Sequence, residues 1–273
     1  MKKSFTLLLL IGLFYLAPIN KCFAQEASEP FEDPKAPAQI NLGADLVSRY
    51  IWRGRDYGNS PSVQPNVSFS VAGFKIGAWG SYGLAQSTKK INDTTLLNMG
   101  HYAEMDLYVC YTYKWFTLQV TDYFFPNSLN ANDGNKYYNY TNATTGHTLE
   151  GCLMFTGPEK FPLQFFVSTL FYGADKNKDS LGFYGAGSEN NYSTYIEAAY
   201  IFKLKKIGVD LKPFIGGIPF GSAWYGDYAG IVNCGLTASK TISITEKFSL
   251  PLYVSAITNP QAESIFLVVG VTL

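Results

Sequence analysis

The feature that most constrains this chain is a two-residue alternation of side-chain type that recurs along it and continues to the last residue. In the final nine residues one face of an extended strand would carry Ile265, Leu267, Val269, Val271 and Leu273, and the other Phe266, Val268, Gly270 and Thr272. Such alternation is the period of a half-buried strand. A strand with an aliphatic face can meet hydrocarbon, and a closed sheet leaves no backbone group unpaired there. The pattern predicts an all-β fold, a transmembrane antiparallel up-and-down β-barrel of about 12 strands.

The alternation also predicts individual strands and their faces. It is clearest where Val63, Val67, Phe69 and Val71 alternate with Gln64, Asn66, Ser68 and Ser70. The first strand is predicted over 40–53, with Tyr50 and Trp52 on the outward face. Three prolines inside predicted strands are expected at bulges or strand ends, because a barrel has no free edge: Pro65, Pro213 and Pro251. One misread hairpin would change the count to ten or fourteen strands.

Loop lengths predict the orientation of this barrel. The links near Gly73, Lys114, Gly157, Lys203 and Thr245 are short, and those between them are mostly long. Outer-membrane barrels have short periplasmic turns and longer extracellular loops. Aromatic residues near strand ends are expected at the two membrane interfaces: Tyr50, Trp52, Trp115, Phe116, Phe155, Phe202 and Phe248.

The N-terminal segment predicts export. Two lysines precede an apolar run over 5–17, and Cys22-Phe23-Ala24 follows it. This arrangement indicates a signal peptide at 1–24, with an uncleaved anchor as the alternative. Residues 25–38 are acidic and rich in Pro and Ala, which predicts a disordered periplasmic tail. The barrel domain is then 39–273, and the expected location is the cell outer membrane.

Composition narrows the functional classes. With 16% aromatic and 15% charged residues and a mean hydropathy near zero, the chain is too apolar for disorder and too polar for a helical membrane protein. Cleavage would remove three lysines and leave 18 basic residues against 21 acidic ones, which argues against nucleic acid as a partner. Cys110, Cys152 and Cys234 form no CxxC pair, so neither a metal site nor a redox motif is expected, and one disulfide stays open.

Charged residues on the predicted inward faces are the candidates for lining the lumen, because charges at membrane depth are tolerated only there. The set, with one aromatic, is Asp45, Arg49, Arg53, Lys75, Trp79, Glu104, Asp106, Glu150, Glu197, Asp210 and Lys212. One interpretation is a narrow hydrated pore that selects a small polar solute. The other is that these groups pair with one another and close the lumen.

Motifs for catalysis are weak. The only histidines are His101 and His147, and neither lies in a lipase-like or protease-like motif. A site built on His147 and Glu150 is conceivable, but a rim position is the simpler interpretation. Asp175–Asp179 imitates the start of a calcium loop, yet Ser180 stands where the loop needs Gly. We expect no enzyme activity, no metal and no cofactor.

Several segments resemble a known family. They are Tyr50-Ile51-Trp52-Arg53-Gly54, Ser60-Pro61 with Gln64-Pro65, Gly77-Ala78-Trp79-Gly80-Ser81, and the closing Asn259-Pro260-Gln261-Ala262-Glu263 with Val268-Val269-Gly270-Val271. These resemble an uncharacterised family of Gram-negative outer-membrane barrels, classed as Gcw_chp or TorF-type porins, closely at the two ends and loosely in the middle. The resemblance implies a porin and implies neither a substrate nor catalytic residues.

Two functions remain as expectations. The first is a porin-like barrel that passes small hydrophilic solutes through a narrow, mixed-charge lumen. The second is a non-conducting structural or surface-interaction barrel that uses long Tyr/Asn-rich loops. An enzyme that acts on envelope lipid is a distant third, and a soluble β-sandwich is the rival fold. The expected partners are outer-membrane lipid, the barrel assembly machinery through the C-terminal strand, and small polar solutes.

Overall fold

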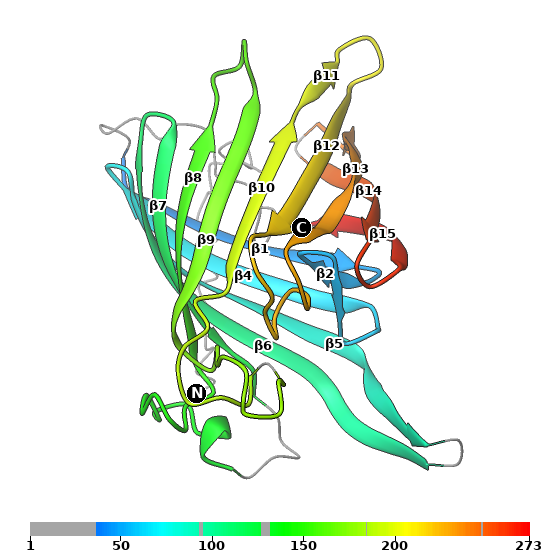
Figure 1. The fold of residues 1–273 in the computed structure, drawn as a ribbon. Helices are drawn as coiled ribbons and strands as arrows, with labels where there is room; N and C mark the ends of the chain where they lie inside the picture. Colours follow the sequence, from blue (N-terminus) through cyan, green and yellow to red (C-terminus); the bar gives the residue numbers. More distant parts are fainter. Residues whose placement is uncertain (1–36, 93–94, 127–131, 184, 247) are drawn as a thin grey trace, which may run out of the picture.

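The chain forms one closed antiparallel β-barrel of 12 strands (Figure 1). The computed structural model describes residues 37–92, 95–126, 132–183, 185–246 and 248–273. The predicted signal peptide and residues 25–36 of the predicted tail lie outside the described residues. The prediction of an all-β barrel of about 12 strands is confirmed.

The wall of the barrel follows the order of the sequence. Its strands are β1 (Gln39–Val47), β4 (Ser62–Val71), β5 (Phe74–Asn92), β6 (Thr95–Tyr113), β7 (Phe116–Phe124), β8 (Thr148–Thr156), β9 (Leu163–Gly173), β10 (Thr194–Tyr200) with its short continuation β11 (Phe202–Leu204), β12 (Val209–Ile218), β13 (Gly230–Ser243), β14 (Ser249–Asn259) and β15 (Ser264–Thr272). Closure joins β1 to β15, where Asp45 lies opposite Thr272. Each strand otherwise pairs with its sequence neighbours, as an up-and-down barrel requires.

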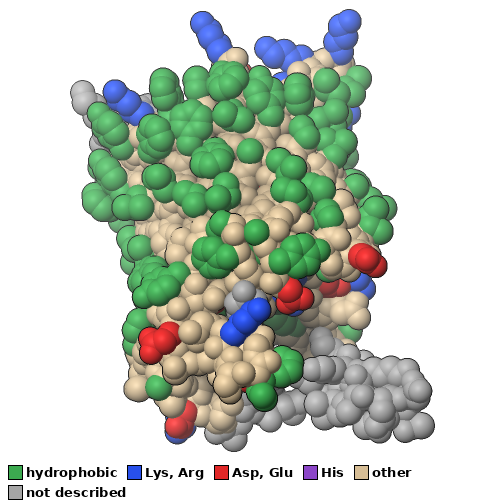
Figure 2. All heavy atoms as spheres, viewed as in Figure 1, with side chains coloured by type: hydrophobic (Ala, Val, Ile, Leu, Met, Phe, Trp, Pro, Cys, Tyr) green, Lys and Arg blue, Asp and Glu red, His purple; other side chains and the backbone are tan. Residues whose placement is uncertain are grey.

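The outer wall is apolar and the inner wall is polar. On β4, Val67 and Phe69 each keep 43% of their surface exposed, whereas the alternating Ser68 and Ser70 are buried. Val269 on β15 is 48% exposed. Figure 2 shows hydrophobic side chains spread over the barrel face, with Lys and Arg side chains projecting from one end. A β-sandwich would bury these aliphatic residues, so the rival fold is excluded.

The two ends of the barrel differ in their connections. Wall strands are joined at one end by short links at 72–73, 114–115, 157–162, 205–208 and 244–248, and we call this the short-turn end. At the other, the long-loop end, the chain runs through 48–61, 125–147, 174–193 and 219–229. Among the described residues, the helical element is the single turn η1 (Asp133–Asn135) in one of these loops. No helix within the described residues is long and apolar enough to cross a bilayer.

The first predicted strand, 40–53, is wrong in its second half. The wall strand β1 ends at Val47, and the following residues form a separate two-stranded sheet of β2 (Tyr50–Trp52) and β3 (Arg55–Tyr57). We call residues 50–57 the inner hairpin. Tyr50 and Trp52, predicted to face lipid, are buried in the hydrophobic cluster of the interior. The alternation continues unchanged from the wall strand into the hairpin, so it could not reveal where the chain turns inward.

Two smaller expectations are also corrected. Between the short links near Gly73 and Lys114 the sequence predicts a long connection, but the ends of β5 and β6 form a long hairpin there instead, which projects beyond the barrel (Figure 1). Pro65 and Pro213 lie inside β4 and β12, and Pro251 lies near the start of β14. Each has a cross-strand partner in register on one side, and on the other side it falls in a break or beyond the end of the ladder. The register shift of β12 falls at Gly216/Gly217 instead. A proline removes one donor from a ladder that the remaining bonds of the strand hold in register.

Cys110, Cys152 and Cys234 are free thiols. Cys110 on β6 and Cys152 on β8 both lie opposite Gln119 of the intervening β7. Two strand spacings separate their Cα atoms by about 9–10 Å, beyond the roughly 7 Å that a disulfide can bridge. The pairing that the sequence left open therefore does not form between these two residues.

Candidate functional site

The inner hairpin enters the barrel from the long-loop end and turns back at Arg53–Gly54. Both turn residues have positive φ, 49° at Arg53 and 79° at Gly54. This is the geometry of a tight hairpin turn, and glycine is favoured there because it has no Cβ. A Cβ on Gly54 would lie 2.0 Å from the carbonyl oxygen of Val232 on β13. The tip of the hairpin therefore rests directly on the backbone of β13.

Gly54→Ala should displace the tip of the hairpin from β13 and lower the free energy of unfolding. The left-handed conformation costs a non-glycine residue about 1–2 kcal/mol, and the clash with Val232 adds a backbone shift worth about 1–3 kcal/mol. The matched control is Gly208→Ala, because Gly208 also has positive φ but a Cβ there meets open space. Urea unfolding in detergent micelles should show a clearly larger loss of unfolding free energy for Gly54→Ala than for Gly208→Ala. Equal losses would mean that the tip does not depend on this close approach.

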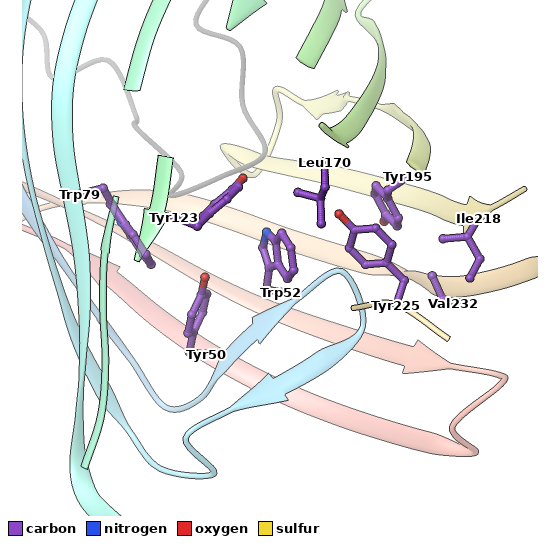
Figure 3. Packing of buried hydrophobic residues seen from close by; sticks show 9 residues of the cluster. All are labelled: Tyr50, Trp52, Trp79, Tyr123, Leu170, Tyr195, Ile218, Tyr225 and Val232. Atoms are coloured by element: carbon purple, nitrogen blue, oxygen red, sulfur yellow. The ribbon is translucent and has the colours of Figure 1, made fainter. Parts of the chain in front are cut away.

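Aromatic side chains fill the interior around the hairpin. Tyr50 and Trp52 pack in one buried cluster with residues from the walls and from one long loop (Figure 3): Trp79, Tyr123, Leu170, Tyr195, Ile218, Tyr225 and Val232. Trp52 makes ring contacts with Tyr123 at 5.8 Å and with Tyr225 at 5.6 Å between centroids. These side chains come from strands on several sides of the barrel. The hairpin and its neighbours thus pack together inside the barrel at this level.

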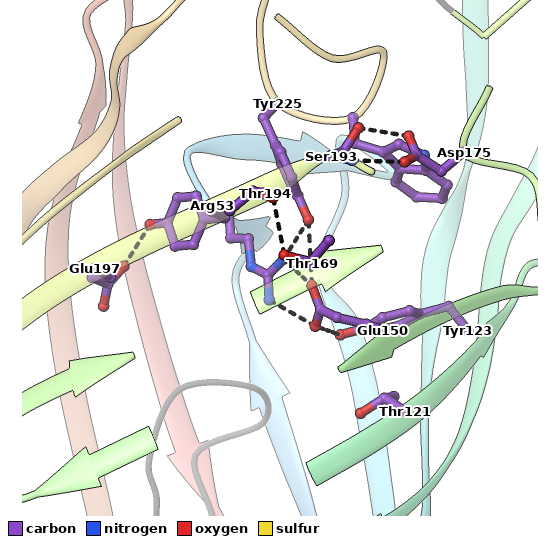
Figure 4. Close-up of polar contacts among 12 residues, drawn as sticks. Arg53, Thr121, Tyr123, Glu150, Thr169, Asp175, Ser193, Thr194, Glu197 and Tyr225 are labelled. Carbon is purple, nitrogen blue, oxygen red and sulfur yellow. Dashed lines mark hydrogen bonds and ion pairs between the residues drawn. The ribbon is translucent and has the colours of Figure 1, made fainter. Parts of the chain in front are cut away.

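A buried ion pair holds the tip of the hairpin. Arg53 donates two parallel hydrogen bonds to Glu150 on β8, at 2.6 Å from Nη1 to Oε1 and 2.9 Å from Nη2 to Oε2 (Figure 4). Both side chains are 3% exposed. Tyr123 donates to Glu150 Oε2 at 2.7 Å, and Arg53 also donates to the hydroxyl of Tyr225. A bidentate arginine–carboxylate pair of this kind fixes the relative orientation of the two side chains in addition to compensating their charges.

Aromatic rings surround the guanidinium of Arg53. Its central carbon lies 4.4 Å from the ring centroid of Trp52, 4.9 Å from Tyr195, 5.2 Å from Phe166 and 5.4 Å from Tyr225. Ring faces attract a cation, and more strongly where water is excluded. The rings and Glu150 together compensate a charge that would otherwise be costly inside the barrel.

The 174–193 and 219–229 loops are bonded to each other, and the 219–229 loop contacts the hairpin. The carboxylate of Asp175, in the 174–193 loop, accepts hydrogen bonds from the backbone N–H of Ser193 at 2.8 Å and from its hydroxyl at 2.6 Å (Figure 4). Ser222 of the 219–229 loop donates to Ser193 Oγ at 2.6 Å. Three residues later, Tyr225 reaches Arg53. This chain of contacts connects the outer loops to the tip of the inner hairpin.

Burial raises the pKa of Asp175 above its ordinary value, and the hydrogen bonds from Ser193 oppose that shift. The pKa of Asp175 is therefore higher in the folded state than in the unfolded state, where it is about 3.9. The stabilisation that Asp175 contributes is complete below the unfolded-state pKa and is lost as the pH rises through the folded-state pKa. We expect Asp175→Asn, which does not titrate, to gain stability relative to the wild type as the pH rises from about 4 toward neutrality. Urea unfolding of both proteins across this range measures the difference; a gain that shrinks with pH would contradict the prediction.

The predicted lumen residues fall into three groups in the structure. Six are buried on inward positions of the wall: Asp45, Trp79, Glu104, Asp106, Glu150 and Glu197. Lys75, Asp210 and Lys212 are partly exposed on wall strands. Arg49 and Arg53 lie outside the wall strands, where Arg49 pairs with Asp56 at 2.6 Å and Arg53 with Glu150. Among the eleven, Arg53 and Glu150 form a direct ion pair with each other at the hairpin tip.

Sequence reasoning missed the aromatic residues of this site. Tyr123, Tyr195 and Tyr225 contact Arg53, Glu150 or the hairpin, and Tyr225 comes from a loop. The available signal was Gly54 between two alternating segments, because tight hairpin turns favour glycine at the second central position.

A small cavity remains beside the hairpin. It has a volume of about 110 Å³ and lies between β2 and the wall strands β1, β4 and β12 to β15. Its lining is mixed, with Asp45, Lys212 and Asn233 among the polar residues and Trp52 and Phe214 among the aromatic ones. The space suits several water molecules, since one water occupies about 30 Å³ of liquid.

His147 belongs to a different cluster, at the long-loop end. Its Nδ1 lies 2.8 Å from Asp122 and its Nε2 lies 2.5 Å from the carbonyl oxygen of Tyr137. The ring stacks on Tyr140 at 4.0 Å between centroids and on Phe124 at 4.6 Å. His147 therefore fastens the 125–147 loop to the end of β7. In the described part of the chain, no three His, Cys, Asp or Glu side chains gather as metal ligands.

Comparison with known families gives one match. The family model described as "Bacterial protein of unknown function (Gcw_chp)" matches residues 32–237. The match includes the inner hairpin, Glu150 and the loops that cover them, and it ends before the closing segment at 259–271. No curated protein matches the sequence.

Proposed function

The chain belongs to the Gcw_chp family of bacterial proteins of unknown function, and we propose that it is an outer-membrane β-barrel whose lumen is closed to solutes by the inner hairpin. Its long loops then act at the cell surface. The observation that carries this proposal is the seating of Arg53 on Glu150 across the lumen, within a cluster of buried aromatic rings. A constitutively open pore needs a continuous water path, and side chains occupy that path at the level of the hairpin.

The ordered loops support a role at the surface. The 125–147 loop is fastened by His147, and the 174–193 and 219–229 loops are bonded through Ser193 and Ser222. Loops with such internal contacts present a defined surface at little ordering cost on binding. The proposal includes outer-membrane lipid and, through β15, the barrel assembly machinery as partners. It assigns no catalytic step.

A second candidate is a gated porin that passes small hydrophilic solutes when the hairpin leaves the lumen. It is favoured by the cavity beside the hairpin and by the small hydroxyl side chains on the inner wall, such as Ser68, Thr237 and Ser255. Such a wall would hold water once the hairpin was displaced. In this candidate the hairpin is a gate rather than a permanent closure.

The test is conductance of the purified protein in planar bilayers. We expect outer-membrane fractionation and heat-modifiable migration on a detergent gel, which report the folded barrel, together with an electrically silent protein. Discrete openings under voltage would favour the gated porin. A permanently open channel from the wild-type protein would overturn the proposal.

A further inference from the structure

Two neighbouring links at the short-turn end bring four lysines together. Lys160 lies in the β8–β9 link, and Lys203, Lys205 and Lys206 lie on β11 and in the link that follows it. The two segments are joined by a backbone hydrogen bond from Ile201 N–H to the carbonyl oxygen of Pro162 at 3.2 Å. We call these four residues the lysine cluster.

The charge of this region is positive. The side chains of the lysine cluster are exposed. Glu159 pairs with Lys203 at 3.1 Å, and Asp210 lies opposite Lys203 in the strand register. Four lysines against these two carboxylates leave an excess of two positive charges. Figure 2 shows basic side chains projecting from this end of the barrel, beyond its hydrophobic surface.

Exposed aromatic rings lie directly beside the lysines. Phe161 is 54% exposed and Phe202 is 51% exposed, and Tyr200 contacts both, at 6.0 and 4.8 Å between centroids. Exposed rings at a strand end are typical of the membrane interface in barrels. The lysines are thus placed where the hydrocarbon gives way to lipid head groups.

We propose that the lysine cluster binds the phosphate head group of an anionic phospholipid. This inference rests on the membrane location in the proposed function and is independent of whether the lumen conducts. Lysine ammonium groups bind phosphate as compact charges with three donors each. Near a membrane surface each lysine contributes about a fivefold gain in affinity for anionic lipid. The aromatic rings beside it hold the cluster at head-group depth.

The experiment compares lipid binding by variants of the whole folded protein. Native mass spectrometry in detergent measures the affinity for phosphatidylglycerol and for phosphatidylcholine. Lys205→Gln with Lys206→Gln should lower the phosphatidylglycerol affinity about 25-fold and leave phosphatidylcholine binding unchanged. The matched control is Lys136→Gln with Lys178→Gln, which removes two exposed lysines from the long-loop end and should have no effect.

Three outcomes would overturn the inference. They are equal phosphatidylglycerol affinity in both double variants, an equal loss for both lipids, and displacement of the lipid by low millimolar inorganic phosphate, which would indicate a soluble-anion site. Heat-modifiable migration verifies that each variant folds. Failure of the proposed function itself would look different, because the wild-type protein would then be absent from the outer-membrane fraction or would conduct without a gate.

Discussion

Replacing the inner hairpin with a short Gly-Ser linker should convert an electrically silent barrel into one with discrete, stable conductance. Residues 50–57 supply Tyr50, Trp52 and Arg53 to the cluster that fills the lumen, whereas the wall strands on either side, β1 and β4, pair with each other without it. Removing the hairpin therefore leaves the hydrogen-bonded wall closed and takes the main obstruction from its interior. The remaining wall positions carry hydroxyl and charged groups that would hold water.

Planar-bilayer recording measures this effect. The control is an equal replacement of 176–183 in the β9–β10 loop, which lies outside the lumen cluster and should leave the protein silent. Both variants must show heat-modifiable migration, so that a change in current is not a change in folding. If the hairpin variant folds and stays silent, the wall side chains alone close the lumen and the hairpin is not the plug.

Breaking the pair between Arg53 and Glu150 should cost about 3–5 kcal/mol of unfolding free energy in either single alanine variant, because each leaves the other charge buried without its partner. The double variant Arg53→Ala with Glu150→Ala should lose much less than the sum, with a coupling energy of up to about 3 kcal/mol. Part of the loss remains, since Tyr123 and Tyr225 also lose hydrogen-bond partners in the double variant.

A matched control for this double-mutant cycle is close by, because Asp56 lies in the inner hairpin and Arg49 directly precedes it. Arg49 and Asp56 form an ion pair with the same 2.6 Å distance, but their side chains are 37% and 16% exposed. Solvent screens such a pair, so its coupling energy should be about 0–1 kcal/mol. Urea unfolding in detergent micelles gives both cycles. Similar coupling in the two pairs would show that burial of Arg53 and Glu150 does not strengthen their interaction.

The failures of sequence reasoning are concentrated at this site. The prediction placed Tyr50 and Trp52 toward lipid because they continue the alternation of Ile40, Leu42 and Leu46. A strand in the wall and a hairpin in the lumen share the same period, since both present one face to apolar surroundings. Only the turn at Arg53–Gly54 distinguishes them, and its meaning depends on Val232, which is far away in the sequence.

The sequence by itself determined the class of fold and the faces of the wall. Alternation of Val67 and Phe69 with Ser68 and Ser70 is a local property, because the pleat sends successive side chains to opposite sides whatever the neighbouring strand is. Only the tertiary structure decided that residues 50–57 leave the wall and pack inside the barrel. Arg53 and Glu150 are 97 positions apart, and no local pattern states that a cation on one hairpin will meet a carboxylate on the opposite wall. Barrel closure brings them together, and the exclusion of water then makes their pairing strong.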